Sequence, residues 1–335
     1  MSRINQVYQQ LLKDILTRGF TYEDPNRKGV KRKQLTDYRI KYNLMKEGFP
    51  LLSLRKIHYK GGIGEFVSFV NGHNNIVDLQ ENGVNFWYKD GYNYYKKSIK
   101  NPISFEEYVR RVKDGDRALG DLGKIYPYQM RNWDNKVDQI EELIKTLKTN
   151  PMATKKTVTM WNPSDMEETS LSCCHWSFEI LTEVLSIRER EDYLKNADAE
   201  IYDSYLNDFK FNDREKALDE IGIPKYGLSV KWHQHSVDVF LGLPTNFIYY
   251  ACMCIFLACE VNMLPKDLIA DLSNVHLYDN AIKPAYELLS RNPNKFKAPK
   301  FFYNNNTEKL SVENFKIEEY ESYENIKVEM LAYNN

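Results

Sequence analysis

Residues 246–262 are apolar at almost every position, and this run restricts the possible folds more than any other feature of the chain. We predict a helix that is apolar on all sides, and such a helix is stable inside the core of a larger protein. Its three cysteines, Cys252, Cys254 and Cys259, are then core residues. As a zinc site they would lack a fourth ligand at suitable spacing, so no metal site is predicted.

The cysteine pattern and the N-terminal sequence indicate a reducing compartment. The chain has five cysteines, an odd number, and three of them lie in the apolar run, which argues against a disulfide framework. The first residues contain no apolar signal region, and no stretch reaches the roughly 18 apolar residues needed to span a bilayer. We therefore expect a cytoplasmic protein without a membrane partner. The Lys- and Asn-rich sequence is typical of a phage or a low-GC bacterium.

The composition is that of a globular protein. The 335 residues are 42% hydrophobic, which is enough apolar mass for a large core. The net charge is −1, so there is no overall basic field and no nucleic-acid partner is expected. Aromatic residues make up 13% of the chain, which fits either core packing or flat pockets for planar ligands.

Hydrophobic periodicity predicts several helices and strands. Helices are expected at 4–18, 60–80 and 138–149, and strands at 157–161, 176–185 and 228–234. Two further stretches read as insertions: 91–118, rich in Tyr and Lys, and 187–222, charged and acidic. Because neither is bounded by Pro-, Gly- or Ser-rich sequence, we expect a single domain over 1–335 with two insertions.

A thiol and an imidazole are adjacent at Cys174-His175, and a turn rich in small hydrogen-bonding side chains occupies 235–246. Cysteine is the strongest side-chain nucleophile where its surroundings favour the thiolate. Taken alone, the pair fits a buried structural thiol better than a catalytic one. Neighbouring residues on a strand also point in opposite directions, so His175 is a doubtful base for Cys174.

A series of segments in fixed order carries a family resemblance. They are NRKGV (26–30), FPLLSLRKIH (49–58), GIGEF (62–66), NNIVDLQENGVNFW (74–87), GDLGKIYPYQMRNW (120–133), DQIEELIKTLKTNP (138–151), TMWNP (159–163), LSCCH (171–175), QHSVDVFLGLPTN (234–246) and VHLYDN (275–280). From about residue 5 to residue 330 the chain resembles the thymidylate synthase family, including its phage pyrimidine hydroxymethylase branch. The resemblance implies an α+β fold, with a large twisted mixed β-sheet flanked by helices, and a sheet-to-sheet homodimer.

The resemblance also implies roles for individual residues. Cys174 matches the nucleophile that adds to C6 of a uracil ring, and Glu65 matches a general acid–base carboxylate. Asn246 matches the amide that reads the uracil edge, since an amide both donates and accepts. The cytosine-specific relatives carry Asp there, so a uracil substrate, dUMP, is expected. The other matched positions are Tyr126, His175 and Asp238 in the catalytic network, Gln234, Ser236, His276 and Tyr278 at the nucleotide, and Trp87, Arg55 and again Asp238 at the folate.

The phosphate site departs from the family pattern of arginines. Arg27 is kept, but the pair expected to reach across from the partner subunit is Lys155-Lys156, and His235 replaces the arginine before Ser236. Lysine supplies a point charge without the bidentate fork of arginine, and histidine is only partly charged near neutral pH. We therefore expect either weaker phosphate binding or a rebuilt pocket.

The C-terminal sequence also departs, because the chain continues past the short apolar tail that closes over folate in the family's synthases. Closure excludes water, and exclusion of water lets hydride rather than hydroxide reach the final intermediate. The leading hypothesis is therefore a dUMP hydroxymethylase that uses 5,10-methylenetetrahydrofolate, acting in phage DNA modification. A thymidylate synthase is the alternative, and a catalytically weakened binding or scaffold homologue is a third.

Overall fold

The structure is a computed structural model that describes residues 3–24, 28–208, 213–307, 309–329 and 331. Its main feature is a mixed six-stranded sheet in the order β1-β2-β6-β5-β4-β3, in which β5 and β6 run parallel and the other pairs are antiparallel. The strands are β1 (Phe20–Glu23), β2 (Lys31–Asn43), β3 (Thr157–Thr159), β4 (His175–Val184), β5 (Tyr226–Asp238) and β6 (Leu264–Tyr278), and a separate pair is β7 (Lys300–Tyr303) with β8 (Phe315–Glu318).

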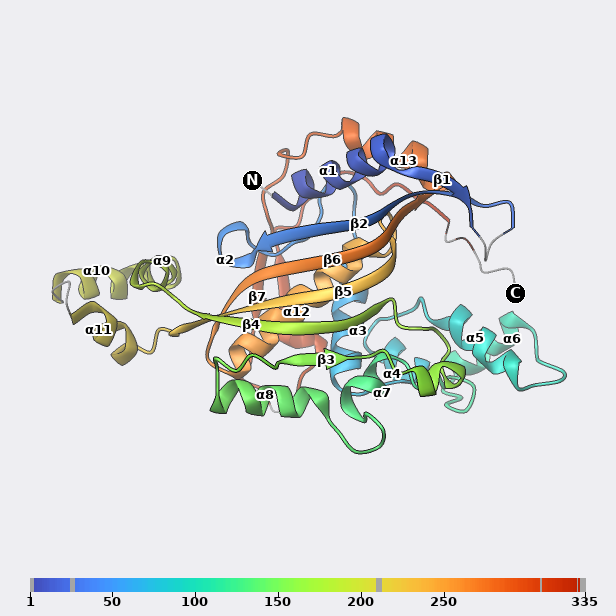
Figure 1. The fold of residues 1–335 in the computed structure, drawn as a ribbon, viewed down its shortest axis with the longest axis horizontal. Coiled ribbons are helices and arrows are strands. Elements are labelled where there is room, and N and C mark those ends of the chain that lie inside the picture. The colour runs from blue at the N-terminus through green and yellow to red at the C-terminus, as the bar shows by residue number, and fades with distance from the viewer. Residues whose placement is uncertain (1–2, 25–27, 209–212, 308, 330, 332–335) are drawn as a thin grey trace.

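Helices flank the sheet (Figure 1), which confirms the predicted α+β architecture. They are α1 (Arg3–Arg18), α2 (Leu44–Glu47), α3 (Tyr59–Val70), α4 (Ile76–Glu81), α5 (Tyr88–Lys97), α6 (Phe105–Lys113), α7 (Tyr126–Arg131), α8 (Gln139–Thr149), α9 (Ile187–Ala197), α10 (Ala199–Asp208), α11 (Arg214–Glu220), α12 (Leu243–Glu260) and α13 (Asp279–Ser290), with short 3₁₀ turns η1 (Pro163–Glu168) and η3 (Val312–Asn314).

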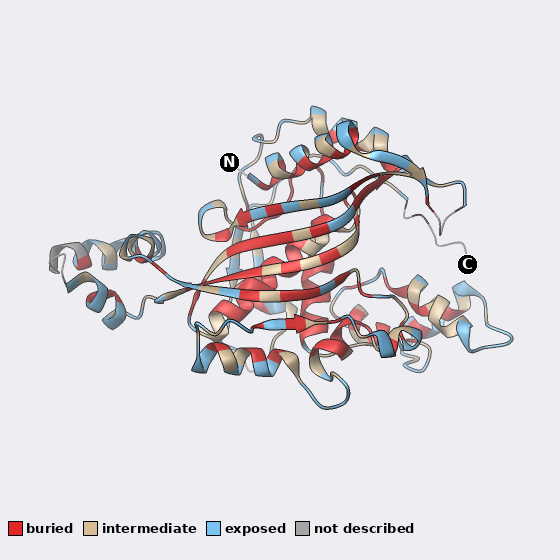
Figure 2. Ribbon diagram, viewed as in Figure 1, coloured by how far each residue is buried: buried red, intermediate tan, exposed pale blue. Residues whose placement is uncertain are grey.

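The apolar run of the sequence forms α12, which lies against β5, β6 and α3 behind the sheet. In Figure 2 most of α12 and much of the sheet in front of it are coloured as buried. Within the described residues, α12 is the one helix long and apolar enough to cross a membrane, which corrects the expectation that no such stretch exists. It is 78% buried inside the protein, as the core helix of a folded domain would be.

The predicted element boundaries agree closely in some places and not in others. The helices expected at 4–18 and 138–149 are confirmed as α1 and α8, and Asp138 caps α8 by accepting from two backbone N–H groups. The single helix expected over 60–80 is wrong, because it is divided into α3 and α4. Gly72, with φ of +81°, takes a conformation that cannot continue a right-handed helix.

The two stretches read as insertions form helices at opposite ends of the sheet. Residues 91–118 include most of α5 and all of α6, and 187–222 includes α9, α10 and α11. The second group extends beyond the ends of β4 and β5 (Figure 1) and has a small buried cluster of its own, formed by Leu194, Tyr205, Ala217 and Leu218.

Candidate active site

Cys174 lies immediately before β4, between α7 and β5. Its backbone N–H donates to the hydroxyl of Tyr126 at 2.8 Å, and its carbonyl accepts from the backbone N–H of His235 at 2.9 Å. The backbone of Cys174 is therefore held by two hydrogen bonds. One is made to Tyr126 at the start of α7, and the other to His235 near the end of β5.

The thiol of Cys174 is not activated by its surroundings alone. Burial raises its pKa to about 11, a hydrogen bond from Tyr126 opposes this rise, and the Asp90 carboxylate adds to it. A thiol with this pKa is protonated near neutral pH.

His175 is buried and serves as part of a packed network. Its ring stacks on Tyr126 with centroids 4.2 Å apart, and its Nδ1 lies 2.8 Å from the hydroxyl of Tyr250. Burial lowers the pKa of His175 to about 3, and His235 contributes to this lowering. The imidazole is therefore neutral and a weak base.

Glu65 is a buried carboxylate on α3. The indole N–H of Trp87 donates to its Oε1 at 2.8 Å, and burial raises the pKa of Glu65 to about 7. Both Glu65 and Cys174 raise the pKa of Tyr126 electrostatically, so the phenol lies within reach of both groups. A carboxyl group that titrates near neutral pH is suited to general acid–base chemistry.

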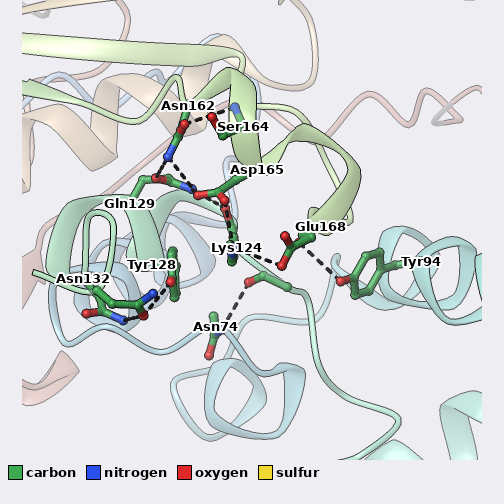
Figure 3. Close-up of polar contacts among 12 residues, drawn as sticks. Asn74, Tyr94, Lys124, Tyr128, Gln129, Asn132, Asn162, Ser164, Asp165 and Glu168 are labelled. Carbon is green, nitrogen blue, oxygen red and sulfur yellow. Dashed lines mark hydrogen bonds and ion pairs between the residues drawn. The ribbon is translucent and has the colours of Figure 1, made fainter.

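Figure 3 shows a polar clamp in which side chains from η1, the loop before α7 and α7 meet around Asp165. Asp165, in η1, accepts from Lys124 Nζ at 2.8 Å and from the side-chain amides of Gln129 and Asn162, each at 2.9 Å. Glu168 pairs with Lys124 at 3.0 Å. The clamp joins η1, which precedes Cys174 in the chain, to the loop and helix that carry Tyr126.

Strand β5 and the start of α12 position a pair of amides. Gln234 Nε2 donates to Asn246 Oδ1 at 3.0 Å, and the indole N–H of Trp232 donates to Gln234 Oε1 at 3.2 Å. Gln234 is buried and Asn246 is half-buried. Gln234 therefore fixes the side-chain amide of Asn246, and part of Asn246 remains exposed to solvent.

Asp238 and Arg55 support the turn between β5 and α12. Asp238 Oδ1 accepts from the backbone N–H groups of Phe240 and Leu241, at 2.9 and 3.1 Å. The guanidinium of Arg55 donates to the carbonyl of Phe240 and lies 4.8 Å from the centre of its ring. The buried Nε of Arg55 has no hydrogen-bond partner within the described residues.

The predicted sugar and phosphate residues lie along adjacent strands. His276 on β6 pairs in register with Asp238 on β5, and its ring contacts that of Tyr278 with centroids 4.9 Å apart. Ser236 has φ of 56°, which interrupts the alternation of β5. His235 is half-buried with its ring edge-on to Trp161, and burial lowers its pKa.

The predicted cross-subunit lysines differ in their surroundings. Lys155 is exposed, whereas Lys156 is 4% exposed and its ammonium donates to the Pro151 carbonyl at 2.7 Å and to the Thr182 hydroxyl. Burial lowers the pKa of Lys156. The ammonium of Lys156 is thus engaged within its own chain. Arg27 lies outside the described residues.

Three residues in this network were not predicted from the sequence. Tyr250 contacts His175, Trp232 contacts Gln234, and Asp90 raises the pKa of Cys174. A strand signal existed for Trp232, because it lies two residues before Gln234 and so on the same side of β5.

A cavity of about 740 Å³ between α2, α9 and β7 contains none of the predicted site residues. Within the part of the chain that is described, no group of His, Cys, Asp and Glu could hold a metal ion.

The site contains a half-buried thiol at Cys174, a buried carboxylate at Glu65 and an amide at Asn246 that Gln234 fixes, and these groups are suited to covalent catalysis on a polar ring. The thymidylate synthase family model matches residues 6–332, and the chain belongs to that family of pyrimidine C5 methyltransferases. It is 30% identical to the thymidylate synthase of Malacoplasma penetrans over 96% of this chain and 97% of that protein. The thymidylate synthase of Mycoplasma mobile is also 30% identical, over 96% and 98%, and that of Mycoplasma genitalium is 31% identical over 78% and 81%.

Proposed function

We propose that this enzyme is a thymidylate synthase, which converts dUMP and 5,10-methylenetetrahydrofolate to dTMP and dihydrofolate. The observation that carries the proposal is similarity over almost the whole chain to proteins of that name. This reverses the order of the two hypotheses from the sequence, which favoured the hydroxymethylase because of the C-terminal extension. Met330 and residues 332–335 of that extension lie outside the described residues.

In the proposed reaction, Cys174 adds to C6 of the uracil ring, and C5 gains carbanion character and attacks the one-carbon unit. C5 then loses its proton, the bond from the one-carbon unit to the folate nitrogen breaks, tetrahydrofolate gives hydride to the exocyclic methylene, and Cys174 leaves C6. Glu65, whose pKa is about 7, handles protons at the ring, with Trp87 holding its carboxylate in place. Tyr126 orders Cys174 through its backbone N–H. A low-dielectric site makes each of these interactions stronger than it would be in water.

We assign nucleotide recognition to β5, β6 and α12. Asn246 reads the N3–H and O4 of uracil, and Gln234 fixes that amide. His276 and Tyr278 bind the sugar hydroxyl, and Ser236, His235 and Arg27 bind the phosphate. Trp87, Arg55 and Asp238 bind folate.

The proposed active form is a homodimer that packs sheet to sheet. The strand β4 exposes Trp176, Leu181 and Val184, at 38%, 41% and 54%. Aromatic and aliphatic side chains of this kind are typical of an interface core. Lys155, exposed next to β3, would reach the partner's phosphate site, whereas Lys156 is engaged in its own subunit.

A product assay tests the proposal. Purified protein is incubated with dUMP and 5,10-methylenetetrahydrofolate, and both nucleotide and folate products are identified. Equal amounts of dTMP and dihydrofolate are expected. Formation of 5-hydroxymethyl-dUMP and tetrahydrofolate would instead establish the hydroxymethylase. Cys174→Ala is the control for turnover through the covalent route.

A further inference from the structure

Trp232 lies beneath the predicted base-reading amide without being able to touch the substrate. Its side chain is 0% exposed, stacks on Tyr250 with ring centroids 4.6 Å apart, and meets Phe247 edge-on. Its one polar atom, Nε1, lies 3.2 Å from Gln234 Oε1, and Gln234 Nε2 lies 3.0 Å from Asn246 Oδ1. The three side chains thus form a continuous hydrogen-bond relay from the core to the surface of the site.

The indole breaks a symmetry that two amides alone would have. The oxygen and nitrogen ends of an amide side chain are almost the same size, so Gln234 and Asn246 could turn over together and keep the bond between them. An indole N–H can only donate, so it requires the oxygen of Gln234. The amide nitrogen of Gln234 must then face Asn246, and the side-chain oxygen of Asn246 must accept its hydrogen bond.

The direction of the Asn246 amide decides which base it matches. Uracil has a donor at N3 and an acceptor at O4, whereas cytosine has an acceptor at N3 and a donor at its exocyclic amine. Asn246 with its oxygen held toward Gln234 can accept from N3–H of uracil with the second lone pair and donate from Nδ2 to O4. The reversed amide would suit cytosine.

We propose that Trp232 is a positioning residue that sets the preference for uracil over cytosine by fixing the amides of Gln234 and Asn246. The inference rests on the proposed function, because it takes Asn246 as the reader of the pyrimidine edge. It adds a buried residue whose effect reaches the substrate through two amides.

Trp232→Phe tests the relay, because phenylalanine retains an aromatic ring in the core and removes the donor. Binding of dUMP and dCMP is measured for both proteins by calorimetry, with turnover of dUMP. The ratio of dCMP to dUMP dissociation constants is expected to fall by about three- to tenfold, as for loss of one buried hydrogen bond. Phe178→Leu is the packing control, since Phe178 also contacts the ring of Tyr250 but carries no donor. It should leave the ratio unchanged.

Gln234→Glu provides a second test if Trp232→Phe does not fold. A carboxylate has only acceptors, so it can satisfy the indole but requires the nitrogen end of Asn246. The preference is expected to move toward dCMP at a pH where the introduced carboxyl group is ionised. An unchanged ratio in a folded Trp232→Phe or Gln234→Glu protein would overturn the relay. Failure of the unaltered protein to bind dUMP would overturn the proposed function instead.

Discussion

The indole N–H of Trp87 donates a 2.8 Å hydrogen bond to Oε1 of Glu65, and both side chains are buried. Burial raises the pKa of Glu65 to about 7, and this hydrogen bond opposes the rise because it stabilises the carboxylate. Trp87 was expected from the sequence only to stack near folate. The contact gives it a second effect, on the proton affinity of the proposed acid–base group.

Trp87→Phe should therefore shift the pH dependence of proton handling at C5. Loss of the hydrogen bond raises the pKa of Glu65 further, so the ionised form appears at higher pH. We expect the acidic limb of the pH profile for release of the C5 hydrogen from dUMP to move up by roughly 0.5–1 pH unit. Trp133→Phe, in the loop before α8, is the matched control. An unmoved limb in a Trp87→Phe protein that binds dUMP normally would contradict the assignment.

Glu65→Gln should increase stability while it removes activity. The folded protein binds the Glu65 proton more tightly than the unfolded chain does, so ionisation of Glu65 costs stability as pH rises from about 4.5 toward about 7. Above that window the variant should be more stable by up to about 3 kcal/mol. Denaturant unfolding at several pH values measures the difference, which should vanish below about pH 4. Equal stability of the two proteins at alkaline pH would argue against a Glu65 pKa that is raised in the folded protein.

The sequence was sufficient to predict α1 and α8, whose apolar faces meet the core, and the apolar run that forms α12, but it did not reveal β2 and β6. Strand β2, KRKQLTDYRIKYN, is mostly polar because one side of it is not covered by helices, so no apolar run marks it. On that side Lys231 pairs with Glu179 and Asp271 across three adjacent strands. Such cross-strand charge partners are visible only once the register is known.

The site was predicted from motif resemblance, and the residues it missed are those that act through a neighbour. Tyr250 is hidden in the apolar run that forms α12, where a tyrosine looks like core packing. Asp90 lies at the edge of a stretch read as an insertion. Its effect on Cys174 depends on how α5 packs, which no local pattern predicts.

Asp90→Asn should make Cys174 more reactive. The Asp90 carboxylate raises the pKa of the Cys174 thiol, so removal of its charge lowers that pKa. We expect the rate of alkylation of Cys174 by iodoacetamide to increase severalfold near pH 8, with the midpoint of the pH profile below that of the unaltered protein. Asp134→Asn, which removes an exposed acid paired with Lys136, is the control. A midpoint that stays in place would show that Asp90 does not act on the thiol.

Asp165→Ala should loosen the segment that carries the nucleophile. The change leaves the amide donors of Gln129 and Asn162 and the ammonium of Lys124 without their shared acceptor. We expect a loss of about 2–4 kcal/mol in the free energy of unfolding, and a larger fall in kcat than in dUMP affinity. Asp134→Ala, in an exposed ion pair, should change stability by less than about 1 kcal/mol. Similar losses of unfolding free energy in the two variants would show that the Asp165 contacts do not stabilise this segment.

His235→Arg should tighten binding of dUMP and flatten its pH dependence. Burial lowers the pKa of His235, so the imidazole is mostly neutral near neutral pH and gains positive charge only as pH falls. The affinity of the unaltered protein for dUMP should therefore rise relative to the variant as pH is lowered from about 8 to about 6. At about pH 8 the arginine variant should bind roughly ten- to a hundredfold more tightly, as a charge-assisted hydrogen bond to phosphate would predict.

His233→Arg is the control for the general electrostatic field. It adds the same charge two residues away, where the side chain lies beside Glu179 and Asp271 instead. Calorimetric titration of the three proteins gives the comparison. Protonation of the dUMP phosphate affects binding by all three proteins alike. If the affinity for dUMP had the same pH dependence in all three proteins, the phosphate would not lie beside His235.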